Sequence, residues 1–305
     1  MESTSARRII VMTGATSGLG AHALKHFMAQ PDVRVIVGAR GAGPQGVDVD
    51  MIDVVPLDLA SLASVRSFAE AVKLRLGDAR IDMLVLNAGA QYQNAEQRSA
   101  DGFEMTFAVN HLAHYLLARL LLPSLAERAR LVITTSDTHD PAILPFAPKA
   151  LDVPALAQPR SGRSEAMRAY PASKLCDLLT ARGLAALPEV TARQIRVIAY
   201  NPGMTPGTSL GRAAPRFAQA MLRSWLVHGL LMLLSRFWPF LYPGTPERAG
   251  EALAQLTLGM VRPPDDRIYA SLVRGEITYP DPSELARSDE ARDRLWRESA
   301  AMVGL

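Results

Sequence analysis

The sequence predicts an α/β protein built on a doubly wound parallel sheet, and three observations support this fold class. Short, almost continuously apolar runs rich in β-branched residues alternate with helix-like runs through the first two thirds of the 305 residues. Strands of this kind are typical of a parallel sheet that is covered by helices on both faces and joined by right-handed crossovers. We find no internal repeat and no low-complexity linker, so we expect one domain with insertions.

The alternating runs place the elements in order along the chain. Pro123 lies near the end of one long helical run and is expected to bend or end it. We expect strands at Ile9–Thr13, Val33–Val37, Asp53–Leu57, Met83–Leu86, Leu131–Thr135 and Ile195–Ala199. We expect helices at Ala21–Gln30, Ser61–Leu76, Asp101–Glu127, Tyr170–Leu187 and Pro246–Leu258.

Three segments break this rhythm. Residues 41–52 hold three glycines and one proline where a crossover helix is expected, so that helix should be short or absent. Residues 137–167 form a long Pro-rich connection. Residues 212–244 are rich in Leu, Met, Trp and Phe and follow the sixth strand. The two later segments are the expected insertions.

Composition narrows the class of protein. Apolar residues make up 49% of the chain and charged residues 21%, which excludes a disordered polyelectrolyte. The net charge of +3 is too small to indicate a nucleic-acid partner. Cys176 is the single cysteine, so no intrachain disulfide can form and a reducing compartment fits. Residues 1–8 are short and polar and lack a secretory apolar segment, so we expect a cytoplasmic protein.

A glycine-rich turn follows the first strand. The sequence TGATSGLG, residues 13–20, lies between that strand and the first helix. Glycines there allow a tight turn and close approach to a pyrophosphate, and the helix N-terminus offers free N–H groups and a positive dipole end. Ordinary strand-to-helix turns also use glycine, but this position after an N-terminal strand favours nucleotide binding. The expected binding residues of the turn are Gly14, Thr16, Ser17, Gly18, Leu19 and Gly20.

The end of the second strand indicates which nucleotide is preferred. Proteins that prefer NAD usually place an acidic residue here to bind the ribose hydroxyls. This chain has no acid at that position, and Arg40 follows instead. A guanidinium matches a 2′-phosphate, so NADP(H) is expected over NAD(H). The alternative is a solvated loop arginine.

Tyr170 and Lys174 are four residues apart and share one helix face. A cation beside a phenol stabilises the phenolate and lowers a pKa that is ordinarily near 10, which predicts a general acid for a developing alkoxide. The alternative is a surface Tyr–Lys pair. Lysine is scarce in this arginine-rich chain, which favours a role for this one.

Taken together, these motifs resemble the short-chain dehydrogenase/reductase family. The glycine-rich turn, Asn87-Ala88-Gly89, Tyr170-x-x-x-Lys174 and Asn201-Pro202-Gly203 occur in the family's order, and the match runs from about residue 8 to 210. The segments LDLASL, VNHLAH and LWRES, at residues 57–62, 109–114 and 295–299, are similar to the retinol dehydrogenase and protochlorophyllide reductase branch.

The resemblance implies a Rossmann fold and an activity. It implies a single domain with a cofactor-binding and catalytic core at about 8–210, a substrate lid at about 211–245, and a C-terminal helix, strand and tail at about 246–305. The implied activity is an NADP(H)-dependent oxidoreductase that moves hydride between nicotinamide and a carbonyl or alcohol of a lipophilic small molecule. The alternatives are reduction of an activated C=C bond and a non-catalytic nucleotide-sensing regulator. A membrane-associated interaction protein is a third class.

The family roles carry over by position. Ser136 should hydrogen-bond the substrate carbonyl, Tyr170 should transfer the proton, and Lys174 should bind the nicotinamide ribose. Asn110 should hold a water that links Lys174 to solvent. Asp58 should face the adenine amino group, and Asn87 is expected to tie strands together rather than touch substrate. The other implied cofactor-binding residues are Leu59, Ala88, Gly89, Pro202, Gly203, Thr205 and Thr208.

The apolar segment 225–241 has three interpretations: a helix packed on the core, a mobile lid over a lipophilic substrate, or an interfacial helix that touches a membrane. We favour the lid. Its strongest apolar run is about ten residues, too short for the about 20 that span a bilayer, so no transmembrane segment is expected. His111 and His114 are expected to pack or cap rather than bind metal. His139 is expected to face water, and the alternative is that it lines the mouth of the substrate site. The oligomeric state is left open.

Overall fold

The computed structural model describes residues 7–41, 43–44, 52–160, 162–206 and 225–305. Its strands form one eight-stranded sheet in the order β3-β2-β1-β4-β5-β6-β7-β8, and β8 alone pairs antiparallel. The order reverses between β1 and β4, which is where doubly wound sheets bind ligands. The bounds are β1 (Arg8–Thr13), β2 (Val33–Ala39), β3 (Ile52–Pro56), β4 (Ile81–Leu86), β5 (Leu125–Thr134), β6 (Arg196–Asn201), β7 (Tyr269–Val273) and β8 (Glu276–Thr278).

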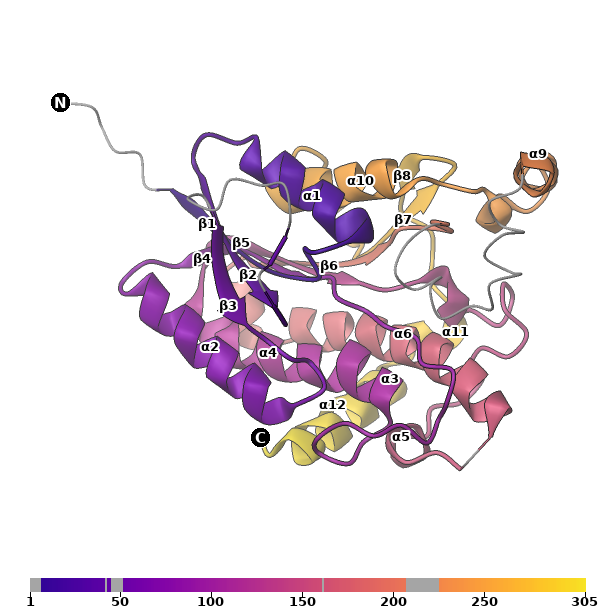
Figure 1. The fold of residues 1–305 in the computed structure, drawn as a ribbon, viewed down its shortest axis with the longest axis horizontal. Helices are drawn as coiled ribbons and strands as arrows, with labels where there is room; N and C mark the ends of the chain where they lie inside the picture. Colours follow the sequence, from indigo (N-terminus) through magenta and orange to yellow (C-terminus); the bar gives the residue numbers. More distant parts are fainter. Residues whose placement is uncertain (1–6, 42, 45–51, 161, 207–224) are drawn as a thin grey trace.

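Helices cover both faces of the sheet (Figure 1). One face carries α1 (Gly18–Met28) and α10 (Pro246–Leu258), and the other carries α2 (Leu62–Leu76), α4 (Ala113–Leu121), α6 (Arg163–Ala185) and α12 (Asp289–Val303). The predicted doubly wound α/β fold is therefore confirmed. The shorter helices are α3 (Met105–Phe107), α5 (Val153–Ala157), α7 (Pro188–Ala192), α9 (Trp225–Leu234) and α11 (Glu284–Arg287).

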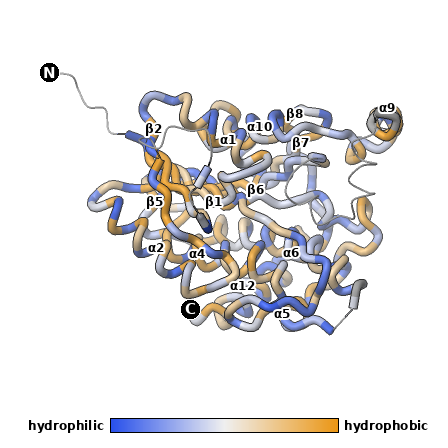
Figure 2. The backbone as a smooth tube through the Cα atoms, viewed as in Figure 1, coloured by the Kyte–Doolittle hydropathy of each residue, from blue (hydrophilic) through white to orange (hydrophobic). Residues whose placement is uncertain are grey.

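The hydrophobic core is divided by the sheet into two layers. Ile9 and Val11 of β1 pack with the layer under α2, α4 and α6, whereas Ile10 and Met12 pack with the layer under α1 and α10. Successive side chains of a strand point to opposite faces, so a strand buried on both faces must be apolar throughout. Figure 2 shows these hydrophobic strands inside a more polar shell.

The predicted helix at 101–127 is wrong in its bounds. The helix begins after Glu104, whose carboxylate accepts the N–H groups of the first turn at 2.9 and 2.7 Å. The chain then makes a π-helical turn at 108–112 before α4. Pro123 ends the run in a 3₁₀ turn, as predicted, and residues 125–127 already belong to β5.

Other predicted elements differ mainly at their ends. The helix expected from Tyr170 begins seven residues earlier, at Arg163, and the strand expected at 195–199 is β6, Arg196–Asn201. The helix at Pro246–Leu258 has the predicted bounds because Thr245 caps it and Gly259 follows it at φ +76°. Most of the shortened crossover at 41–52 lies outside the described residues.

Candidate active site

A cavity of about 400 Å³ opens at the carboxyl ends of the parallel strands. It spans the point where the strand order reverses, so residues far apart in sequence meet there. Among its lining residues are nearly all the predicted site residues: Gly14, Thr16, Ser17, Gly18, Leu19, Gly20, Arg40, Asp58, Leu59, Asn87, Ala88, Gly89, Ser136, Tyr170, Lys174, Pro202, Gly203 and Thr205. Thr208 lies outside the described residues.

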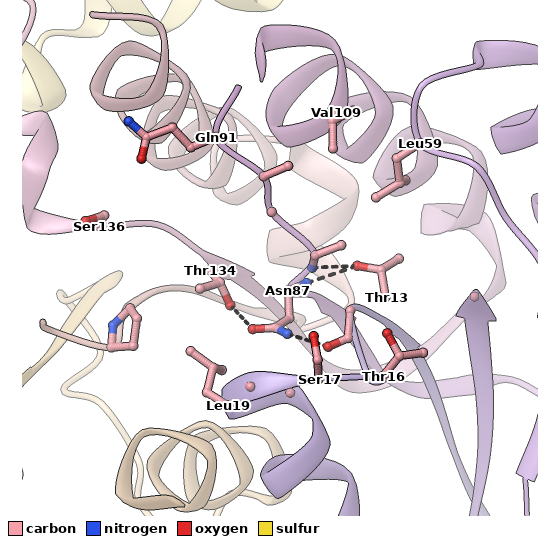
Figure 3. A pocket seen from close by; sticks show the side chains of 18 of the residues that line it. Thr13, Thr16, Ser17, Leu19, Leu59, Asn87, Gln91, Val109, Thr134 and Ser136 are labelled. Carbon is pink, nitrogen blue, oxygen red and sulfur yellow. Dashed lines mark hydrogen bonds between the residues drawn. The ribbon is translucent and has the colours of Figure 1, made fainter. Parts of the chain in front are cut away.

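The glycine-rich turn forms one wall of this cavity. Gly14 has φ +70°, and a Cβ there would lie 2.6 Å from the backbone nitrogen of Ala88. A Cβ on Gly20 would lie 1.9 Å from the Gly14 carbonyl oxygen. Only glycine fits either position, so the turn can follow this tight path next to β4. Figure 3 shows Thr16 and Ser17 at the start of α1, facing the cavity.

The amino end of α1 is suited to hold an anion. Ser17 is its N-cap, and within the described residues its side chain makes no capping hydrogen bond. The first N–H groups and the positive end of the helix dipole therefore face the cavity. Arg40, exposed at the end of β2, lines the same cavity. The start of α1 and Arg40 are thus two groups in one cavity that can hold anionic parts of a ligand.

Asn87 braces three strands behind the turn, as predicted. Its side-chain amide donates to the Gly14 carbonyl oxygen at 3.1 Å and accepts from the Thr134 hydroxyl at 3.0 Å (Figure 3). Its backbone N–H and that of Ala88 both donate to the Thr13 hydroxyl oxygen at 3.1 Å. The ends of β1, β4 and β5 are therefore fixed relative to one another.

This network also determines the tautomer of His114. The Thr13 oxygen already accepts two N–H groups, so its own proton is donated to Nε2 of His114, 3.0 Å away. Nδ1 of His114 then carries the hydrogen and donates to the carbonyl oxygen of Asn110 at 2.9 Å. Burial lowers the pKa of His114 to about 3, and the Lys174 charge acts in the same direction. His114 is thus a neutral structural group.

Asn110 lies in the π-helical turn, directly behind the cavity. Its side-chain oxygen accepts from the Ala90 N–H at 2.8 Å, and its amide donates to the Ala90 carbonyl and the Ser173 hydroxyl, both at 2.9 Å. These bonds join the loop after β4 to α6. These hydrogen bonds satisfy the buried polar side chain of Asn110. No described contact tests the predicted water between Lys174 and solvent.

Lys174 is held by two acceptors beneath the cavity. Its ammonium donates to the Thr134 carbonyl at 3.0 Å and to a carboxylate oxygen of Asp177 at 2.8 Å. Both side chains are buried, 4% and 2% exposed. Its Nζ also lies 5.8 Å from the centre of the Tyr170 ring. Sequence reasoning missed Asp177, although an acid three residues after the lysine of a helical Tyr-x-x-x-Lys pair lies close to its charge.

Lys174 acts on the Tyr170 pKa in the predicted direction, but it does not decide the net shift. Burial raises the pKa of Tyr170 above 10, and this outweighs the opposing effect of the Lys174 charge. The negative charges of Asp177 and Asp137 raise it further, whereas the Ser136 hydroxyl lowers it. The phenol is therefore protonated at neutral pH.

Ser136 begins the loop after β5. Its hydroxyl oxygen accepts the Thr138 N–H at 3.3 Å, and its hydroxyl donates to Asp137 at 3.4 Å. It therefore caps a short 3₁₀ turn at 137–139 while it lines the cavity next to Tyr170. These long hydrogen bonds leave the hydroxyl able to turn toward a ligand.

A second cavity of about 230 Å³ adjoins the first through Gly203, which lines both. Its walls are mainly apolar and include Met204, Phe240 and Leu272, so residues of the 225–241 segment reach it. His139 lines it as well, which corrects the expected solvent-facing histidine. The ring is 1% exposed because Nδ1 bonds the Ser136 carbonyl at 2.6 Å and the ring packs edge-on against Tyr269.

Helix α9 lies apart from the body of the fold (Figure 1). Leu230 is 55% exposed and Leu233 60% exposed, so the interpretation of these residues as core packing is wrong. Arg274 of the β7–β8 hairpin donates to the carbonyls of Ser235 and Arg236 and anchors the end of the helix. In the described part of the chain, no helix combines the length and apolarity needed to cross a bilayer.

The family follows from comparison with known proteins. A family pattern described as short chain dehydrogenase matches residues 8–142. Retinol dehydrogenase 14 of Mus musculus is 31% identical over 98% of this chain and 86% of its own length. The chain belongs to the short-chain dehydrogenase/reductase family. This assignment confirms the resemblance inferred from the motifs and makes the protein a member of an oxidoreductase family.

Two further relatives agree with the branch and the fold of this short-chain dehydrogenase/reductase. Protochlorophyllide reductase B of Oryza sativa subsp. japonica is 31% identical over 97% of this chain and 77% of its own length. An uncharacterized protein from Mycobacterium paratuberculosis has a solved structure that covers 98% of this chain and 94% of its own, with a TM-score of 0.65 and 25% identity. The chain is thus similar to both proteins named in the predicted branch.

Proposed function

We propose that this protein is an NADP(H)-dependent reductase of carbonyl groups on apolar small molecules. The observation that carries the proposal is that Ser136, Tyr170 and Lys174, from two separate elements, line the same cavity as the glycine-rich turn. A proton donor, a hydroxyl that polarises an oxygen and a phosphate-binding turn are together what hydride transfer to a carbonyl requires. The test is a screen of NADPH consumption over ketones, aldehydes and enones, with identification of the products.

The chain's own residues have distinct roles in this reaction. The residues of the glycine-rich turn would hold a nicotinamide dinucleotide, which would supply the hydride. Ser136 and Tyr170 hydrogen-bond the substrate oxygen, and Tyr170 donates its proton as negative charge develops there. Lys174, buried below them, has one N–H directed to neither Thr134 nor Asp177. That N–H is available to the nicotinamide ribose.

Arg40 supports a preference for NADPH, and its removal tests that preference. Arg40→Ala should weaken NADPH binding about tenfold or more, because a charge-assisted hydrogen bond to phosphate contributes about 1.5–3 kcal/mol. NADH binding, which lacks the 2′-phosphate, should change little and is the internal control. Titration of both cofactors against both proteins measures this. Equal affinity of the wild-type protein for the two cofactors would contradict the proposal.

The second cavity supports an apolar substrate. It adjoins the cavity that holds Tyr170 and Ser136 at Gly203, and Pro239, Phe240 and Tyr242 bring the segment after α9 onto its wall. A substrate whose carbonyl lies at Tyr170 can extend its apolar body into this cavity. Residues 225–245 are then the described part of the substrate lid that we propose for this domain, and residues 211–224 of the predicted lid lie outside the described residues.

Phe240 tests the lid directly. Phe240→Ala should raise KM for large apolar ketones about tenfold, because burial of a Phe side chain contributes about 1.5–3 kcal/mol, and should leave NADPH affinity unchanged. Phe237→Ala is the matched control, since that ring is on the same segment but 75% exposed. Steady-state kinetics with small and large ketones separates the two variants. Equal KM values for both variants would remove the lid from the proposal.

A further inference from the structure

Asp177 places a negative charge next to the lysine that acts on the proposed proton donor. An ammonium group has three N–H donors, and here one is directed to Thr134 and one to Asp177. The pair lies on one face of α6, at i and i+3, and is almost completely buried. Burial raises the pKa of Asp177 to about 6, and the Lys174 ammonium 2.8 Å away opposes this shift and stabilises the carboxylate.

Structural stabilisation does not account for this acid. A buried ion pair seldom stabilises a fold more than well-packed neutral residues do, because the loss of hydration offsets the attraction. An asparagine would place an oxygen acceptor at the same position without a charge. Compared with an asparagine, Asp177 therefore adds only a negative charge, and this charge lies next to the lysine that acts on Tyr170.

The other charged and titratable groups around the pair do not cancel this effect. On α6 they are Tyr170 and the buried thiol of Cys176, whose pKa is raised by burial. From α4, His114 faces Lys174 and is neutral. From the loop after β5, Asp137 adds a second negative charge that acts on Tyr170. Among the described groups that act on Tyr170, one positive charge is thus opposed by two negative ones.

We infer that Asp177 is a positioning residue that offsets the charge of Lys174, weakens the stabilisation of the Tyr170 phenolate by that charge, and so biases the site toward reduction. Reduction needs the protonated phenol as donor, whereas oxidation of an alcohol needs the phenolate as base. An unopposed lysine would stabilise the phenolate and favour oxidation. The inference rests on the proposed role of Tyr170, but its electrostatic part can be tested without any substrate.

The first test is the titration of Tyr170 by tyrosinate absorbance, taken as the difference between a protein and the same protein carrying Tyr170→Phe. Asp177→Asn should lower the Tyr170 pKa by about 1 or more, because a nearby unopposed cation lowers such a pKa by about 1–3. Glu165→Gln is the matched control, an acid-to-amide change at an exposed ion pair on the same helix. An unchanged Tyr170 pKa in Asp177→Asn would overturn the inference.

Two further measurements keep the test decisive. If Asp177→Asn does not fold, the wild-type titration alone decides, because a Tyr170 pKa below about 8 contradicts a neutralised lysine. Where a ketone–alcohol pair is found, Asp177→Asn should raise alcohol oxidation at pH 7 about tenfold and shift its pH profile to lower pH. Absence of turnover on every carbonyl would count against the proposed function, whereas the titration would still test the charge effect.

Discussion

Replacement of Tyr170 by Phe is expected to lower the rate of carbonyl reduction by about 10²–10⁴-fold, the usual contribution of a positioned acid. The change removes only a hydroxyl at the cavity wall, so the melting temperature and the affinity for NADPH should stay close to those of the wild type. The measurement is single-turnover NADPH oxidation at saturating cofactor, followed across pH.

Tyr92→Phe is the matched control for this variant. It deletes the same hydroxyl from another tyrosine that lines the same cavity, and it should leave turnover unchanged. If Tyr170→Phe retained near wild-type turnover on a carbonyl substrate, the proton would come from another source. Reduction of a C=C bond would then become the better account of the site.

Lys174→Ala is expected to have the largest effect on stability. It should lower the free energy of unfolding by about 3–5 kcal/mol, because it leaves the buried Asp177 carboxylate without its counter-charge. It should also weaken cofactor binding and abolish turnover. Chemical unfolding of the variant and the wild type measures the stability change.

The loss should depend on pH in a defined direction. Without the lysine, the folded-state pKa of Asp177 rises above about 6, while its unfolded value stays near 4. The folded state then binds more protons than the unfolded state between these values, so the variant becomes less stable as pH rises through this range. The double variant Lys174→Ala/Asp177→Asn should regain stability at pH 8. A pH-independent loss that the second change fails to relieve would refute this explanation.

The sequence predicts the fold well because its strongest signals are local. β-branched apolar runs fix the central strands, and Thr245 and Gly259 fix both ends of α10. The predicted helix before β5 extends too far, to residue 127, because residues 125–127 include no proline or glycine that would end a helix. Their place in β5 is determined by pairing with β4, which is a long-range contact.

The candidate site was predictable where chemistry lies in short motifs. The glycine-rich turn, Tyr170 and Lys174 stand in short motifs whose order in the chain resembles one family, and the structure brings them to one cavity. Asp177 was missed, and His139 was expected to face water, because the importance of both side chains depends on burial. A carboxyl or an imidazole looks the same in sequence whether it faces water or the protein interior, and only the packing of α6 and β7 decides between them.

Cys176 gives this molecule a built-in reporter of its own fluctuations. Cys176 lies between Lys174 and Asp177 in the sequence of α6, and its thiol is completely buried. Burial raises the pKa of this thiol well above the ordinary value. Because thiol reagents attack the exposed thiolate, labelling has to wait until this helix opens. Cys176 is the single cysteine of the chain, so only this site is labelled. The rate of labelling therefore measures how often α6, which carries the proposed proton donor, leaves its native packing.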